Sequence, residues 1–329
     1  MPKHLGALRN SSFMLFMSLS LMGCVEGARL DAPNKEILDH IDKNSPEIDG
    51  VEQTLLKSAK RASGLGEYEK ATQLYAQLLE MDHANKEYQI HYADGLRHMQ
   101  DFDGADQLYQ LILKENPKSL DAKEGRALTK LAQGNFASAG TLLAEIHKDD
   151  KKRWRTLNAL GIVLVERGQL EDAVAYFKAA LREHPDYPAL LNNIGLATAM
   201  NGNVVDAANY LTRGAQAAPT KSAIKKQIQF NLALIKGISG DMHGAEIILK
   251  DLLPEAGVAN NLGFYAHLAK NNELAKSYLN TALTKSPYHY QRAWENLNSL
   301  DSTTPPDGKP KGSHSSRKVV HVPNHSASR

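Results

Sequence analysis

The sequence is almost without cysteine, since Cys24 is the only one among 329 residues. A disulfide within the chain needs two cysteines. The usual zinc sites need several thiolates or a Cys/His cluster at fixed spacing. A single thiol therefore excludes both kinds of site.

An excess of one charge and a second long apolar run are also lacking. The formal net charge is +2, which does not favour nucleic acid as a partner. No segment after residue 30 is apolar enough to span a bilayer. With 42% hydrophobic and 23% charged residues, most of the chain is expected to be a water-facing, folded protein.

Catalytic motifs are missing as well. The chain has no His-Glu-x-x-His, no Gly-x-Ser-x-Gly, no Gly-rich phosphate loop and no cysteine outside the N-terminal segment. His91 and His98 lie seven residues apart, two turns along a helix, which is too far for one metal ion. We therefore predict no enzymatic activity, no metal site and no bound cofactor.

The N-terminus has the three-part layout of a secretory signal peptide. A basic start with Lys3 and Arg9 precedes an uncharged apolar run, residues 13–22, and then the small residue Gly23. The run is too short to cross a bilayer as a helix. This layout predicts export of the protein, which argues further against nucleic acid.

The stretch Leu21-Met22-Gly23-Cys24 resembles the lipobox of bacterial lipoproteins. The resemblance implies a signal peptide over residues 1–23, a lipid on Cys24, and a lipidated N-terminus and linker over residues 24–51. Val25 stands where an Asp would be expected to retain a lipoprotein on the inner membrane, so the resemblance implies the periplasmic face of the outer membrane. A leftover cysteine in an ordinary signal peptide is the alternative.

The middle of the chain is repetitive, with an offset of 34 residues between residues 157–185 and 191–219. This offset is the tetratricopeptide period. The residues that coincide are Gly161 with Gly195, Gly168 with Gly202, Ala173 with Ala207, and Pro185 with Pro219. We predict an all-α tetratricopeptide-repeat solenoid, a right-handed superhelix of about seven helix pairs over residues 52–290. The end of a C-terminal helix is expected over 291–301, and a disordered basic tail over 302–329.

Two positions of each repeat carry only Gly or Ala, and a third carries a large apolar or aromatic residue. Positions 8 and 20 are expected where the two helices of a pair approach closely, and position 24 is expected to fill the space beside them. Position 8 holds Ala59, Ala93, Ala127, Gly161, Gly195, Ala233 and Gly263, and position 20 holds Ala71, Ala105, Ala139, Ala173, Ala207, Ala245 and Ala275. Position 24 holds Tyr75, Tyr109, Leu143, Phe177, Leu211, Leu249 and Leu279.

The first helices of the pairs are expected to line an extended concave groove that binds protein partners. Its candidate residues are Asn158, Ile162, Asn192, Asn193, Leu196, Asn231, Asn260 and Asn261. An asparagine amide both donates and accepts, and so holds an extended peptide backbone whatever its sequence. The alternative is that these asparagines are ordinary repeat residues whose amides cap a turn or face water.

The segment NLALIKGISGDMHGAEIILKDLLPEAGVANNLGFYAHL, residues 231–268, completes a further resemblance. Together with the lipobox and the repeats, it resembles the TadD lipoproteins of tight-adherence (Tad/Flp) pilus machines, over about residues 155–268. The resemblance implies a non-catalytic scaffold that helps a pilus secretin or another envelope component to assemble or localise. The alternatives are an adaptor for envelope proteases or peptidoglycan hydrolases, and a pilotin for another secretin.

Overall fold

The computed structural model describes residues 50–286 and 290–302. The predicted signal peptide, Cys24, most of the predicted linker and nearly all of the predicted tail lie outside these residues. Within the described ranges the chain forms fifteen helices and no strand. They are α3 (Gly50–Gly64), α4 (Tyr68–Met81), α5 (Lys86–His98), α6 (Phe102–Glu115), α7 (Leu120–Ala132), α8 (Phe136–Asp149), α9 (Trp154–Glu166), α10 (Leu170–Glu183), α11 (Pro188–Met200), α12 (Val204–Ala217), α13 (Ala223–Ile238), α14 (Met242–Lys250), α15 (Glu255–Leu268), α16 (Asn272–Lys285) and α17 (Gln291–Ser302).

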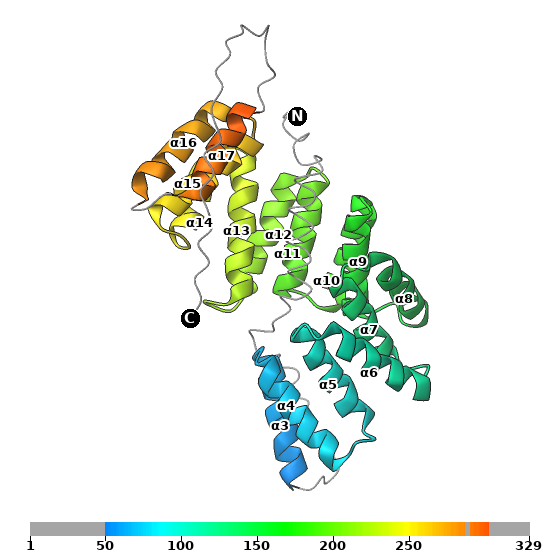
Figure 1. Ribbon diagram of the computed structural model, residues 1–329. Coiled ribbons are helices and arrows are strands. Elements are labelled where there is room, and N and C mark those ends of the chain that lie inside the picture. The colour runs from blue at the N-terminus through cyan, green and yellow to red at the C-terminus, as the bar shows by residue number, and fades with distance from the viewer. Residues whose placement is uncertain (1–49, 287–289, 303–329) are drawn as a thin grey trace, which may run out of the picture.

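The helices form seven consecutive pairs, from α3 with α4 to α15 with α16. Helix α17 follows the last pair and packs against α16 and α15. The pairs stack in chain order, so that the backbone runs as a curved solenoid (Figure 1). The predicted tetratricopeptide solenoid of about seven helix pairs is confirmed.

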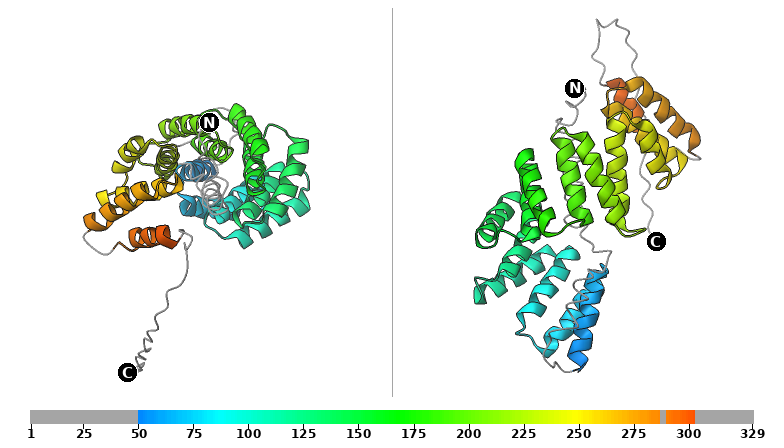
Figure 2. Two further views of the ribbon diagram at one scale, coloured as in Figure 1. Left: turned by 90° about the horizontal axis from the view of Figure 1, so that it is seen from above. Right: turned by 180° about the vertical axis from the view of Figure 1, so that it is seen from behind.

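The two helices of a pair occupy different layers of this solenoid. From α5 onward, the first helix of each pair packs against the first helix of the next pair, whereas the second helices pack mainly against the first helices that flank them. In a curved stack, the layer whose members touch one another lies on the inside of the curve. The first helices therefore form the inner face, and Figure 2 shows the solenoid curving when seen from above.

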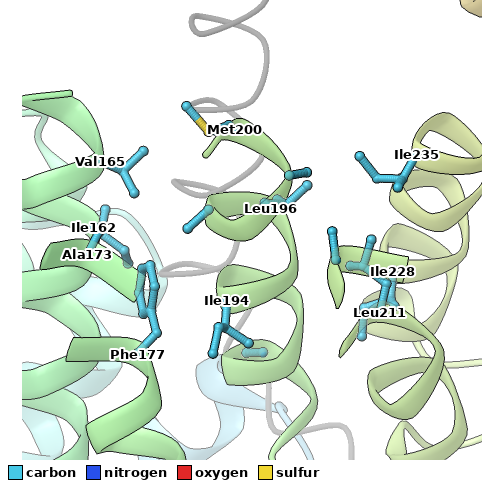
Figure 3. Packing of buried hydrophobic residues seen from close by; sticks show 14 of the residues in the cluster. Ile162, Val165, Ala173, Phe177, Ile194, Leu196, Met200, Leu211, Ile228 and Ile235 are labelled. Atoms are coloured by element: carbon cyan, nitrogen blue, oxygen red, sulfur yellow. The ribbon is translucent and has the colours of Figure 1, made fainter. Parts of the chain in front are cut away.

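The predicted small positions lie where the two helices of a pair meet. All the alanines at positions 8 and 20 are buried, and so are all seven large residues at position 24. A Cβ atom added at Gly161 would lie 2.5 Å from Cε1 of Phe177, and one at Gly195 would lie 2.8 Å from Cγ of Leu211. Figure 3 shows Phe177 beside Ile162 in this core. The role predicted for these positions is confirmed.

The turn inside each pair requires a left-handed residue. Glycine supplies it in five pairs, for example Gly168 with φ of 73°. Gln100 and Lys270 take the equivalent place in two pairs, with φ of 66° and 61°. The backbone of these two residues takes a left-handed conformation that favours glycine.

The irregular spacing of the later repeats has its origin in helix lengths. Helix α13 has 16 residues, and α14 has only 9. A turn over residues 251–253 and Pro254, the N-cap of α15, follow α14 directly. The long helix and the short one together restore the period, so the pairing continues into α15 and α16.

Candidate functional site

The asparagines of the inner face bond mainly to one another. Asn193 Nδ2 donates to Asn158 Oδ1 at 2.9 Å and joins α11 to α9. Asn231 Nδ2 donates to Asn192 Oδ1 at 2.8 Å and joins α13 to α11. Asn192 and Asn193 are fully buried, and Asn231 is buried. The structure therefore corrects the expectation of amides open to a peptide, because these four amides link neighbouring inner helices.

The last two candidate asparagines differ from each other. Asn296 of α17 donates to Oδ1 of Asn260 at 3.0 Å, which repeats the link between inner helices at the C-terminal end. Asn261 Nδ2 donates to the carbonyl of Gly257, four residues earlier in α15, at 2.8 Å. An amide bonded to the local backbone matches the ordinary interpretation of these asparagines better than a peptide contact.

The two apolar groove candidates are not accessible either. Ile162 and Leu196 have no exposed surface and belong to the largest hydrophobic cluster (Figure 3). Helix α11 is buried along its whole length after Pro188. The expectation that Ile162 and Leu196 form an open surface is therefore corrected, because in this structure they contribute to the core.

A charge cluster that the sequence did not predict joins α5 and α6; its Arg97 and Tyr109 are buried, and its Asp94 is partly exposed. Asp94 accepts a hydrogen bond from the Tyr109 hydroxyl at 2.6 Å and pairs with Arg97 at 3.1 Å. Burial alone would raise the pKa of Asp94, but the charges of Arg97 and His91 and the Tyr109 bond outweigh it and lower this pKa to about 2. The side chain of Arg97 is 9% exposed. The carboxylate therefore stays ionised to hold a buried guanidinium.

A second polar junction joins α7 to α9. Glu124 accepts from the Thr156 hydroxyl at 2.6 Å and pairs with Arg153 at 3.0 Å. Arg153 also pairs with Asp121 at 2.5 Å. The partners lie 29 and 32 residues apart, so they come from nearby but not equivalent positions of successive repeats. The junction supports packing between repeats, as the asparagine pairs do further along the chain.

The two histidines of α5 are stacked on tyrosines of α4. The rings of His98 and Tyr68 are nearly parallel at 3.8 Å, and those of His91 and Tyr75 lie 4.9 Å apart. Burial lowers the pKa of His91 against the opposing effect of Asp94. No group of three or more His, Cys, Asp or Glu side chains among the described residues is arranged to hold a metal ion. None of the described helices is long and apolar enough to cross a membrane.

Comparisons with known proteins identify the repeat. The family model described as a tetratricopeptide repeat matches residues 158–222, which include most of α9 and all of α10 to α12. No curated protein matches the chain significantly.

The chain is similar to several solved structures. The chain is similar to the APC/C hetero-tetramer Cut9–Hcn1, with 15% identity and a TM-score of 0.55 over 77% of this chain and 50% of that one. It is also similar to the human IFIT1 dimer with m7Gppp-AAAA, with 17% identity and a TM-score of 0.55 over 75% of this chain and 62% of that one. A thermophilic tetratricopeptide-repeat protein of Thermus thermophilus, TTC0263, is 16% identical, with a TM-score of 0.48 over 54% of this chain and 96% of that one.

These findings define the class of the protein through its fold. The seven helix pairs and the matched repeats make the chain a tetratricopeptide-repeat solenoid. Such solenoids present an extended face on which protein partners bind, and they are generally scaffolds without enzymatic activity. The low identities establish the fold alone, so what the similar proteins bind is not transferred to this chain.

Proposed function

We propose that the protein is a lipid-anchored scaffold of the bacterial envelope that binds partner proteins along its inner face. The observation that carries this proposal is the continuous inner layer formed by the first helices from α5 to α15 and by α17. A surface built from successive repeats suits an extended partner, because each repeat adds a short strip of contact. The signal-peptide layout and the lipobox around Cys24 support the anchor.

The proposed partner system is the tight-adherence (Tad/Flp) pilus. The segment that carries this resemblance, residues 231–268, contains the second half of α13 and all of α14 and α15, where the repeat spacing is irregular. In this proposal the protein sits on the periplasmic face of the outer membrane and helps a pilus secretin or another pilus component to assemble or localise. The lipid on Cys24 supplies attachment, since buried acyl chains contribute about 0.8 kcal/mol per methylene.

The anchor is tested by Cys24→Ala. Metabolic labelling with a fatty acid should mark the wild-type protein and leave the variant unlabelled, and the variant should appear in the soluble periplasmic fraction. Ser20→Ala, a substitution of similar size inside the apolar run, is the matched control and should keep the label. Label on the Cys24→Ala protein would show that the lipobox assignment is wrong.

The partner is tested by crosslinking in envelope membranes followed by purification of the protein. Recovery of a Tad secretin would support the pilus proposal. Recovery of an envelope protease or a peptidoglycan hydrolase, or of an unrelated secretin, would replace it by the adaptor or the pilotin function that the sequence left open. Lipidation and partner choice are measured separately, so either half of the proposal can fail alone.

A further inference from the structure

Arg155 stands out among the charged residues of the first helices. It lies in the first turn of α9, it is exposed, and its guanidinium sits over the Trp154 ring at 5.4 Å from the ring centroid. Within the described ranges, no carboxylate lies within ion-pair distance of Arg155. A positive charge in the first turn opposes the helix dipole, so Arg155 does not stabilise its own helix.

Helix geometry places Arg155 on the inner side of the solenoid. On α9, Thr156 donates a hydrogen bond to Glu124 of α7, and Asn158 accepts one from Asn193 of α11. Because successive side chains of a helix are turned by about 100°, Arg155 lies between the directions of these two contacts, which both lead to neighbouring inner helices. Arg155 therefore faces the inside of the curve.

Several other cations on the inner side of the solenoid are already paired. Arg97 pairs with Asp94 at 3.1 Å, and Lys60 pairs with Glu87 at 3.0 Å. Arg153 pairs with Glu124 and Asp121, as described above. Arg155 is left as an exposed cation whose guanidinium lies over an aromatic ring, and its N–H groups are available to donate hydrogen bonds to a bound partner.

We propose that Arg155, oriented by Trp154, binds one carboxylate side chain of the partner segment on the inner face. This inference rests on the proposed scaffold function and names the chemistry of its partner. A guanidinium edge matches a carboxylate with two parallel hydrogen bonds. A polyanion such as nucleic acid does not fit, because the paired carboxylates already neutralise the neighbouring guanidinium groups and leave no basic patch on this stretch of the solenoid. The partner is therefore a peptide segment with an isolated Asp or Glu.

A random peptide library displayed on phage and selected on the purified full chain tests this inference. The wild-type protein should select peptides that share an Asp or Glu at one position. Arg155→Glu should instead select Lys or Arg at that position, because the charge of the site is reversed. Lys178→Glu makes the same change of charge on the exposed side of α10 and is the matched control, which should select acidic peptides as the wild type does.

A synthetic peptide from the selection gives the magnitude. Its affinity should fall about ten- to a hundredfold with Arg155→Gln, as expected for loss of a charge-assisted hydrogen bond. Circular dichroism of each variant checks that the fold is retained. Peptides without a common acidic position, or an unchanged selection with Arg155→Glu, would overturn the inference and leave the scaffold function standing. A wild-type protein that selects no peptide would count against the inner face as a binding surface and overturn both.

Discussion

The substitution Gly161→Ala tests the packing rule of the solenoid with the smallest possible change. A Cβ atom at Gly161 would lie 2.5, 2.7 and 2.8 Å from three carbons of the Phe177 ring, where ordinary contacts are 3.4–4 Å. Phe177 is fully buried at the centre of the pair α9 and α10. The ring must therefore move by about 1 Å in a close-packed core.

Two opposing effects decide the magnitude. Overpacking of this kind costs about 1–3 kcal/mol. Replacing Gly by Ala inside a helix gains about 0.5–1 kcal/mol from backbone entropy. The net loss in the free energy of unfolding is expected to be about 1–2 kcal/mol, which lowers the midpoint of thermal unfolding by about 2–8 °C for a chain of this size.

The other repeats indicate a second substitution that should compensate for Gly161→Ala. Ala127 and Ala233 stand at the position of Gly161, and their partners at the position of Phe177 are Leu143 and Leu249, all fully buried. The pair Gly161→Ala with Phe177→Leu should therefore recover part of the loss. In the repeat of Ala93, the aromatic residue Tyr109 is directed towards the next pair. Its ring lies against Gly125, at 2.3 Å from a Cβ atom added there.

Thermal unfolding of the four proteins, followed by circular dichroism, completes a double-mutant cycle. Gly50→Ala is the control, since a Cβ there meets nothing within 4 Å, and its midpoint should not fall. A Gly161→Ala protein as stable as the wild type would refute the reasoning. So would a double variant that loses the full sum of the two single losses, because the two residues would then not compete for the same space.

Two further outcomes follow from the polar contacts. Asn192→Ala and Asn231→Ala should each destabilise by about 1–3 kcal/mol, because each removes the buried hydrogen bond between these two side chains. Urea unfolding should show that the double variant loses less than the sum of the two single losses, whereas strict additivity would mean that the 2.8 Å bond carries no coupling. The pKa of Asp94 is about 2 against an ordinary 3.8, so its contribution of about 2 kcal/mol is present above pH 4 and is lost as the pH falls towards 2. Asp94→Asn should flatten the stability between pH 4 and pH 2 and should destabilise at pH 7, where Arg97 would stay buried without a counter-charge; an unchanged acid profile would contradict the assignment.

The pairing of helices was predictable because its signal lies within each repeat. Positions 8, 20 and 24 meet inside one helix pair, so a single period of 34 residues contains the whole contact. The same contact between small and large residues recurs in all seven repeats, and the contact of Gly161 with Phe177 is one example. The structure confirms these positions because close approach of two helices tolerates only Gly or Ala at the point of contact.

The partners of the polar side chains on the inner helices could not be predicted, because they depend on contacts between repeats, and the repeat period describes only contacts within one repeat. The sequence placed Asn158, Asn192 and Asn193 on the inner helices, but a step of one residue turns a side chain by about 100° around the helix axis. That rotation decides whether an amide faces a partner or the next helix. The packing of successive inner helices determined the direction of these amides, since it brought Asn193 to Asn158 and Asn231 to Asn192.

The partners of the charged side chains were likewise not predictable from the sequence. A carboxylate or a guanidinium has a long reach, and its partner depends on which helices stand within a few ångströms of it. Nothing in the repeat pattern indicates that Arg97 and Arg153 are paired and that Arg155 is not. The sequence by itself determined the helix pairs and their order, because these follow from local size and period. Only the tertiary structure decided which polar groups remain open to a partner, because that depends on every neighbour at once.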